Sequence, residues 1–585
     1  MASTLTSPGV LSIENDQSFI TQQPITVGAA IIGPTVLGPV EIPTIVTSYS
    51  DYKNKFGSTF LSGSQVYTYF TSIAAFNYFN NGGESLLVAR VVSGTFLPAT
   101  TATSSVTGGA GGGVSILNSS SVEALVLNTI SQGTIMNSSC SLDASGSLNA
   151  SGSQNNIRWQ IVNNDTSSGT FSLLIREGDD NTNNPVTLET WTNLSMDPTA
   201  PNYVSRVLGN QVRAYSSVDN QITVTGDYPN ASKYVYVQSV KTPTPLYFDN
   251  TGIAKSQYTA SIPLNASGSF TGATGDLFYG GGANYYSNIS SSSTNTQGIS
   301  ASNYGNMINL LSNQDDYRFN GLMTPGLFAQ TANLGASQVT SIINNTMNRG
   351  DNIYVSDLVP FNATITEVTT QSNAKNTSYA ASYWPWVQTI DPDSAQLVWV
   401  PASTMIGGVY AYNDSVSEPW FAPAGINRGG LSSVVRAEKK LSQANRDTLY
   451  TNKVNPIATF PGTGVVVYGQ KTLQTKASAL DRVNVRRLLI ALKSYIGQVA
   501  NNLVFEQNTI ATRTSFLNQV NPYLESVQQR QGLYAFKVVM DSSNNTPDVI
   551  DRNQLVGQIY LQPTKTAEFV YLNFNILPTG VSFPA

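Results

Sequence analysis

The chain has 585 residues with no histidine and one cysteine, and 30 Lys and Arg against 35 Asp and Glu give a net charge of -5. Only 11% of its residues are charged, against about 25% in an average soluble protein, while 41% are hydrophobic. The length predicts several domains, and the low net charge with this apolar share excludes disorder of the whole chain. Because histidine is absent, Ser-His-Asp and Cys-His catalytic systems are excluded, and we predict no catalytic centre, no metal site and no cofactor.

The N-terminal residues 1–22 predict an extended arm. A Ser-Pro-Gly break at 7–9 is followed by alternating Val10, Ser12 and Glu14. No basic stretch precedes an apolar one, so we expect no signal peptide. The apolar segment 26–46 is interrupted by prolines, which favours short strands over a membrane span. We therefore expect a soluble cytoplasmic product without stable membrane insertion.

The next residues predict an α/β unit. Residues 25–57 contain Gly-Pro steps typical of strands and turns. Apolar residues at near-helical spacing predict a helix from Ser64 to about Asn80, ended by two glycines. Ser85 to Val92 then predicts a buried strand.

Residues 98–300 differ in composition, because Ser, Thr, Asn and Gly dominate them. Short strand-like runs occur at Ala124–Leu127, Phe171–Ile175 and Tyr234–Val240. This pattern predicts one or more inserted all-β domains on the surface.

After residue 303 helices and strands alternate again. Residues 482–503 carry an i, i+3/i+4 apolar stripe, and a further helix is predicted near 512–530. Residues 568–577 alternate as a strand near the end of the chain.

The resulting prediction is a multidomain α/β (α+β) core with inserted all-β domains and extended arms at both ends. The expected parts are an N-terminal arm at 1–22, a discontinuous α/β middle domain at 23–97 and 265–400, an inserted β-rich region at 98–264, a C-terminal α/β domain at 401–567, and a C-terminal strand and arm at 568–585.

Basic residues are concentrated between residues 428 and 493, which hold twelve Lys and Arg but three acids. A solvated helix face explains part of this pattern, and a surface for an acidic partner explains the rest. Nucleic acid is disfavoured, because aromatic and basic residues do not alternate there. The candidate contact residues are Arg428, Arg436, Lys439, Arg486, Arg487 and Lys493.

Three short motifs could carry chemistry, but each is more typical of a turn. The glycine run at 277–282 lacks a phosphate-binding lysine, and residues 391–394 contain two acids without the rest of a calcium loop. Glu177, Asp179 and Asp180 could serve as general acids or bases, but their Gly- and Asn-rich surroundings favour a hairpin loop.

Longer motifs occur in a fixed order along the chain. They are SPGVLSIENDQS (7–18), the segment 27–57, FNYFNNGGESLLVARVV (76–92), RGDNIYVSDLVP (349–360), YAASYWPWVQTID (379–391), VPASTMIGGVYAYND (400–414), PWFAPAGINRGGL (419–431), the segment 449–473, DRVNVRRLLIALKSYI (481–496) and VFEQNT (504–509). In order and spacing these motifs resemble the contractile phage tail sheath family, over a little more than half of the chain.

The resemblance implies a mechanical protein. Sheath subunits stack as six-fold rings around a tail tube, and the N-terminal arm and C-terminal strand of one subunit extend a β-sheet in its neighbours. By that resemblance the partners are other copies of the chain, the tail tube protein, the baseplate and the tail terminator or neck proteins, and the location is the virion tail after assembly in the host cytoplasm. The candidate strand-exchange residues are Val10, Ser12, Glu14, Phe569, Tyr571 and Phe574.

Three alternatives remain open at the level of sequence. The first is the sheath of a bacteriocin-like or other contractile injection system. The second is a surface adhesin or carbohydrate-binding β-protein, suggested by the composition of residues 98–300. The third is a carboxylate-based glycosidase in the same region.

Overall fold

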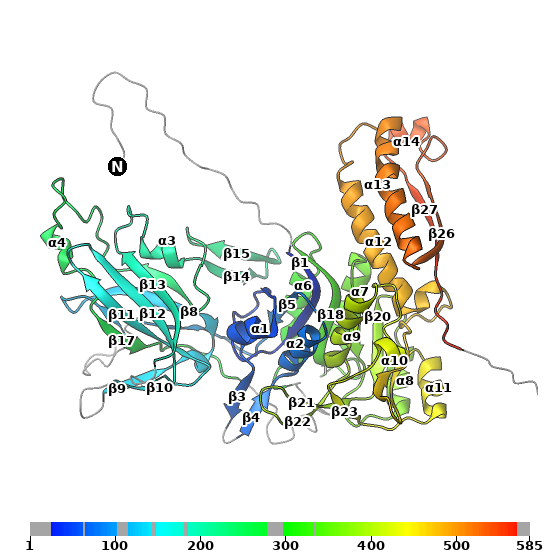
Figure 1. Ribbon diagram of the computed structural model, residues 1–585, viewed down its shortest axis with the longest axis horizontal. Helices are drawn as coiled ribbons and strands as arrows, with labels where there is room; N and C mark the ends of the chain where they lie inside the picture. Colours follow the sequence, from blue (N-terminus) through cyan, green and yellow to red (C-terminus); the bar gives the residue numbers. More distant parts are fainter. Residues whose placement is uncertain are drawn as a thin grey trace, which may run out of the picture.

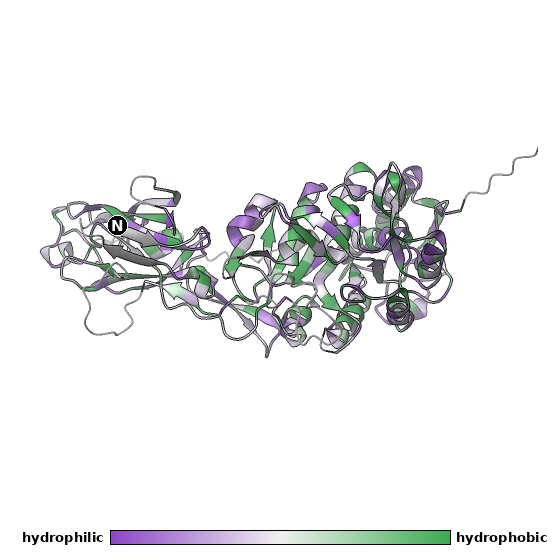
Figure 2. Ribbon diagram, turned by 90° about the horizontal axis from the view of Figure 1, so that it is seen from below, coloured by the Kyte–Doolittle hydropathy of each residue, from purple (hydrophilic) through white to green (hydrophobic). Residues whose placement is uncertain are grey.

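The computed structural model describes residues 25–62, 65–101, 115–142, 148–180, 185–277, 297–332 and 334–569. Three parts lie along its long axis in Figure 1: a β-rich part, a central α/β part and an upright lobe that contains the last helices. Viewed at a right angle, the same parts form an elongated particle (Figure 2).

An eight-stranded mixed sheet forms the centre of the α/β part. Its strand order is β2-β5-β1-β18-β19-β20-β24-β25, and the six inner strands run parallel while both edge strands are antiparallel to their neighbours. The strands are β1 (Ile25–Gly33), β2 (Thr44–Val46), β5 (Leu86–Arg90), β18 (Tyr317–Phe328), β19 (Ile353–Asp357), β20 (Ala380–Trp384), β24 (Asn455–Phe460) and β25 (Gly464–Val467).

Side chains alternate between the two faces of this sheet, and each face has its own hydrophobic core. In β1, Ala29 and Ile31 join one cluster, while Ala30 and Ile32 join the other. Such two-sided burial is typical of parallel sheets covered by helices. The first face packs on α2 (Phe70–Asn80) and α9 (Ser403–Val416), and the second on α6 (Gly305–Leu310), α7 (Ala336–Arg349), α8 (Ile365–Asn373) and α11 (Gln443–Thr451).

The N-terminal unit differs from its prediction in two places. Residues Gln65–Thr68 form strand β4, which pairs with β3 (Thr59–Ser62), and the helix α2 begins only at Phe70. The Val-Tyr-Thr run favours a strand when a partner strand is near, so hairpin pairing overrides the helical spacing. Helix α1 (Tyr49–Phe56), with Ser48 as its N-cap, lies in the segment predicted as strands and turns.

The described residues between 98 and 277 form two larger sheets around a separate hydrophobic cluster, and two hairpins, β9 with β10 and β14 with β15. The order of one is β13-β12-β11-β17; in the other, β16, β8 and β6 are joined by β7. Apolar residues from both sheets, such as Leu125 and Trp159, lie in a single cluster, an arrangement typical of face-to-face sheets. The elements are β6 (Pro98–Thr100), β7 (Ile116–Leu117), β8 (Glu123–Gln132), β9 (Ser139–Leu142), β10 (Leu148–Ser151), β11 (Ile157–Asp165), β12 (Thr170–Glu177), β13 (Thr187–Ser195), α3 (Val204–Leu208), β14 (Val212–Ser216), β15 (Gln221–Thr225), β16 (Val235–Val240), α4 (Ser256–Thr259) and β17 (Ala266–Ser269).

The lobe consists of two long helices and a two-stranded sheet. Helices α12 (Val483–Asn501) and α13 (Ile510–Gln529) agree with their predictions, and the apolar stripe of α12 packs against α13 in one cluster. Strands β26 (Leu533–Val539) and β27 (Gln558–Pro563) pair with each other, and α14 (Pro547–Asp551) lies between them in sequence. The predicted terminal strand at 568–577 lies outside the described residues from residue 570 onward.

Two predicted boundaries separate strands that the structure joins. The boundary at residue 400 divides the main sheet, because β24 and β25 belong to it. The boundary at residue 264 excludes β17, which pairs with β11. A separate three-stranded sheet combines β21 (Val387–Ile390), β22 (Leu397–Val400) and β23 (Val434–Ala437), with α10 (Gly425–Arg428) nearby in sequence. Among the described residues, no helix is both long and apolar enough to cross a membrane.

Candidate functional site

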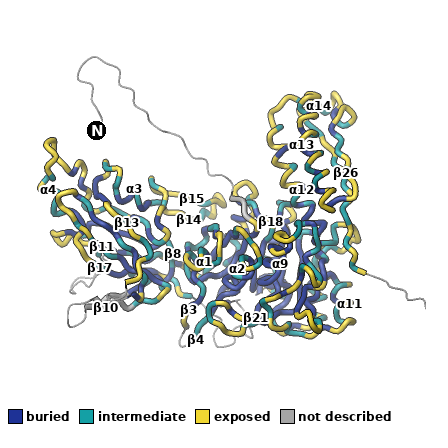
Figure 3. The backbone as a smooth tube through the Cα atoms, viewed as in Figure 1, coloured by how far each residue is buried: buried dark blue, intermediate teal, exposed yellow. Residues whose placement is uncertain are grey.

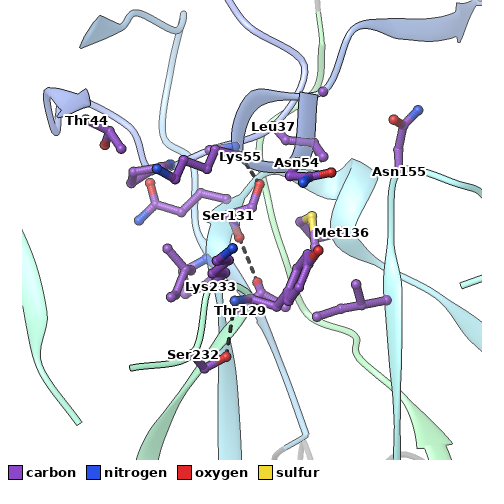
Figure 4. A pocket seen from close by; sticks show the side chains of 18 of the residues that line it. Leu37, Thr44, Asn54, Lys55, Thr129, Ser131, Met136, Asn155, Ser232 and Lys233 are labelled. Carbon is purple, nitrogen blue, oxygen red and sulfur yellow. Dashed lines mark hydrogen bonds between the residues drawn. The ribbon is translucent and has the colours of Figure 1, made fainter. Parts of the chain in front are cut away.

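A cleft of about 880 Å³ lies between the α/β part and the β-rich part. Figure 4 shows Lys55 and Asn54 on one side of it and Ser131, Thr129 and Lys233 on the other. Its lining is mostly amides, hydroxyls and lysines. The carboxylate of Asp393 is already paired with Lys53, at 3.3 Å. The cleft therefore offers mainly polar contacts, and the acids that line it are Glu177 and Asp393.

Two of the acids that the sequence suggested for chemistry, Asp180 and Asp391, have structural contacts, while Glu177 ends β12 and lines the cleft. Asp180 is buried and forms ion pairs with Arg158 and Arg176, and it accepts a hydrogen bond from the Val186 amide at 2.9 Å. Asp391 accepts hydrogen bonds from the hydroxyls of Thr68 and Ser394. Within the described ranges, His, Cys, Asp and Glu nowhere gather as three or more potential metal ligands. The oxygens of Asp180 and Asp391 are thus used in holding turns and strands together.

Four of the predicted contact cations are at least partly exposed. Arg436 lies over the ring of Trp399, 5.2 Å from its centroid, and Lys439 donates to Asn362 at 2.8 Å. Arg428 lies over Phe421, and Lys493 is on the exposed side of α12. These cations belong to different elements, so the basic segment of the sequence does not form one continuous helix face.

Arg486 and Arg487 do not fit the predicted docking surface, because both are buried. Arg486 is 4% exposed, lies 3.9 Å from the ring centroid of Tyr379 and donates to Ser378. Arg487 is 7% exposed and forms an ion pair with Asp414 at 2.5 Å. Their guanidinium groups fix α12 to the α/β part, and a partner cannot reach them without moving this helix.

The sheet of the lobe has two strands in the described residues, β26 and β27. Phe536, Val538, Ile559 and Leu561 pack toward the lobe's hydrophobic cluster. In the described part of the chain, each strand has only the other as its strand partner, so both outer edges are open to a further strand, although the Tyr534 and Val539 carbonyls accept side-chain hydrogen bonds. A two-stranded sheet is marginal on its own, and additional strands stabilise it.

The tip of the lobe is apolar, a feature that sequence reasoning missed. Phe505 is fully exposed, Ile510 is 79% exposed and Val504 is 60% exposed. Phe505 also has a φ of 70°, which is costly for a bulky residue. Strained and exposed positions of this kind cluster at functional sites. The signal that could have identified the tip is the adjacent apolar pair Val504 and Phe505, which lies between the two predicted helices.

The predicted strand-exchange residues are mostly outside the described ranges. Val10, Ser12, Glu14, Tyr571 and Phe574 are all in this group. Phe569 is described and is 67% exposed. Just before it, Glu568 accepts hydrogen bonds from Tyr450 at 2.8 Å and from Arg482 at 2.7 Å.

Comparison with known proteins finds two regions of the chain that match family models. Residues 300–473 match the phage tail sheath protein central domain, and residues 475–577 match the phage tail sheath C-terminal domain. The tail sheath protein of Vibrio phage KVP40 is 45% identical over 185 residues, which is 32% of this chain and 28% of that protein. The tail sheath protein of Enterobacteria phage T4 is 42% identical over 185 residues, which is likewise 32% of this chain and 28% of that protein. The match thus spans less than a third of the length of these relatives.

A solved structure extends the likeness to the fold. The crystal structure of a sheath tail protein from Listeria innocua superposes with a TM-score of 0.51 at 9% identity, covering 92% of this chain and 95% of the other. Five strands of the main sheet (β18, β19, β20, β24 and β25) and the elements of the lobe lie within the two matched regions, while β1, β2 and β5 precede them. Two consecutive regions of the chain, residues 300–473 and 475–577, are thus similar to the two domains of phage tail sheath proteins.

Proposed function

We propose that the protein is the structural subunit of a contractile tail sheath. It polymerises as stacked hexameric rings around a tail tube, and its contraction drives the tube through the host envelope. The observation that carries this proposal is the match of two consecutive sheath domains over residues 300–473 and 475–577. Contraction needs no catalyst, because a few kcal/mol of conformational free energy per subunit adds up over the whole sheath.

We further propose that β26 and β27 accept strands from neighbouring subunits. The donors are the N-terminal arm around Val10, Ser12 and Glu14 and the C-terminal strand with Phe569, Tyr571 and Phe574. Open edges on both strands support this assignment, since a donated strand satisfies unpaired N–H and C=O groups. Such an exchange is heterologous, so it propagates into a helical polymer.

The lobe is also our candidate for contact with the tube. Its exposed apolar tip at Val504, Phe505 and Ile510 supports this, as does the exposed Lys493 on α12. The remaining exposed cations, Arg428, Arg436 and Lys439, are candidates for contacts with acidic surfaces of neighbours. Baseplate and terminator or neck proteins complete the proposed set of partners.

The β-rich region is proposed as an insertion that faces outward on the virion. Its own hydrophobic cluster supports independent packing, and its boundaries are refined to residues 98–277. Assembly is proposed to take place in the host cytoplasm, before the tail joins the virion.

Electron microscopy of the purified chain tests the proposal. The full chain, alone and with its tube protein, should form hollow striated tubes with six-fold end views. A chain without residues 1–22 is the matched control, because it keeps every described element and loses one proposed donor strand. Monomers under all conditions, with and without tube protein, would contradict the sheath proposal. Tubes from the truncated chain would contradict the role of the N-terminal arm alone.

A further inference from the structure

The carboxylate of Glu568 is held by three side chains that come from separate segments. The hydroxyl of Tyr450 donates to it at 2.8 Å, Nε2 of Gln470 at 3.0 Å and Nε of Arg482 at 2.7 Å. Tyr450 belongs to α11, Gln470 follows β25, and Arg482 is the residue before α12. Three segments of the folded body thus converge on one residue beyond the last strand of the lobe.

These donors are themselves fixed by further contacts. Arg482 also pairs with Asp481 at 2.8 Å. The ammonium of Lys471 lies 4.4 Å from the ring centroid of Tyr450 and donates to its carbonyl at 2.9 Å. Charged hydrogen bonds among partly buried groups are stronger than neutral ones, so the site is well suited to hold a chain segment in place.

The segment held here has no regular structure of its own. Strand β27 ends at Pro563, and the described chain continues to Phe569 without a further helix or strand. Thr566 adds a second attachment, because its hydroxyl accepts a hydrogen bond from Gln470 at 2.7 Å. Side-chain contacts at Thr566 and Glu568 therefore determine where the C-terminal arm leaves the body.

We propose that Glu568 is a positioning residue that anchors the root of the C-terminal arm. The inference rests on the proposed function, in which the residues after 568 are donated to a neighbour. Tension on the donated strand then passes through Tyr450, Gln470 and Arg482 into the body. It does not peel β27 away from β26, a pair held by its own backbone bonds and one covered face. Tyr450 and Gln470 lie in the central domain, while Arg482 lies in the C-terminal domain. Both domains therefore bear the tension on the arm.

The test uses Glu568→Gln in the full-length chain. This variant keeps the size of the side chain but replaces the charged acceptor of the Arg482 hydrogen bond. Amide hydrogen exchange of residues 564–569 in the monomer should become about tenfold faster, which corresponds to the loss of one charge-assisted hydrogen bond. The monomer's melting temperature should stay the same, while tubes should be fewer and shorter.

Glu418→Gln is the matched control. It removes the ion pair of Glu418 with Arg530, at 2.7 Å, without touching the arm. Tubes of Glu568→Gln that equal those of Glu418→Gln in number and length would overturn the anchoring role. So would unchanged exchange of residues 564–569. A wild-type chain that forms no tubes, even with tube protein, would instead show that the sheath proposal itself has failed, and the arm's role with it.

Discussion

The central α/β part and the C-terminal lobe protect their sheets in different ways. The main sheet has eight strands, and hydrophobic clusters cover both of its faces. Its last strand, β25, is further bridged by Gly430. The lobe's sheet has two strands, one covered face and, within the described residues, two open edges. Figure 3 shows the same contrast, with buried segments concentrated in the centre and many exposed ones along the lobe.

The main sheet thus has both of its faces covered within one chain, whereas the lobe's sheet can still accept strands from another chain. A close-packed core resists deformation and moves as one body. A short sheet with open edges gains free energy when other strands join it. We therefore expect the centre to keep its shape during contraction and the lobe and arms to carry the changing contacts.

The largest expected effect is loss of stability in Trp386→Ala. The Trp386 ring is 2% exposed, and its centroid lies 5.8 Å from that of Phe70 and 5.7 Å from that of Phe328. Removing such a ring should cost about 3–5 kcal/mol of unfolding free energy, measured by urea denaturation of the monomer. Tyr534→Ala is the control on the lobe, where the side chain is 62% exposed, and it should leave monomer stability within about 0.5 kcal/mol. Equal losses in the two variants would refute the contrast between centre and lobe.

A somewhat smaller loss is expected for Arg487→Glu. This change breaks the ion pair with Asp414 and places two acids together beside a buried position. Arg487 is buried but the Asp414 side chain is 39% exposed, so breaking the pair should cost about 1–3 kcal/mol and the monomer itself should melt at a lower temperature. Lys493→Glu, on the exposed side of the same helix, should leave the melting temperature unchanged and affect assembly alone. If the Arg487→Glu monomer is as stable as the wild type but fails to assemble, Arg487 would instead belong to the predicted docking surface.

Sequence reasoning succeeded where local pattern determines structure. The apolar stripe of α12 predicts both the helix and its packing, and residues 86–90 form the buried strand expected near them. It failed where the partner lies far along the chain. Strand β4 depends on pairing with β3, and the burial of Arg487 depends on Asp414, 73 positions away. The anchoring of Glu568 depends on Tyr450, which lies 118 positions earlier.

The stability of the protein should depend on pH through the buried carboxyl of Asp357. Burial raises the pKa of this carboxyl to about 7, although Ser403 donates to it from both its amide and its hydroxyl. In the unfolded chain the pKa is about 3.9, so the native state binds more protons between these values. Stability therefore falls as pH rises from about 4 to about 7 and is level above that.

Asp357→Asn isolates this contribution, because all other groups titrate alike in both proteins. The stability of the wild type minus that of the variant should be smaller at pH 8 than at pH 5, by thermal or urea unfolding at both values. A difference that is independent of pH, or that grows with pH, would show that the carboxylate is not destabilised in the native state.

The smallest expected effect on assembly is that of removing the β-rich region. Leu97 donates its amide hydrogen bond to Thr274 at 3.0 Å, so the two ends of the region are neighbours and a short Gly-Ser linker can replace residues 98–273.

The deletion exposes Leu37, which packs on that region, and it removes the Gln132 carbonyl that accepts from the buried Arg90 at 2.9 Å. Monomer stability should therefore fall by about 1–3 kcal/mol, on the order of one lost hydrogen bond and one exposed apolar side chain, while the eight-stranded sheet and the lobe keep all their strands. Because no proposed donor or acceptor strand is lost, the shortened chain should still form striated tubes of lower outer diameter in electron micrographs. A folded, soluble deletion protein that stays monomeric would place an assembly contact in the β-rich region, and an insoluble one would contradict the refined boundary.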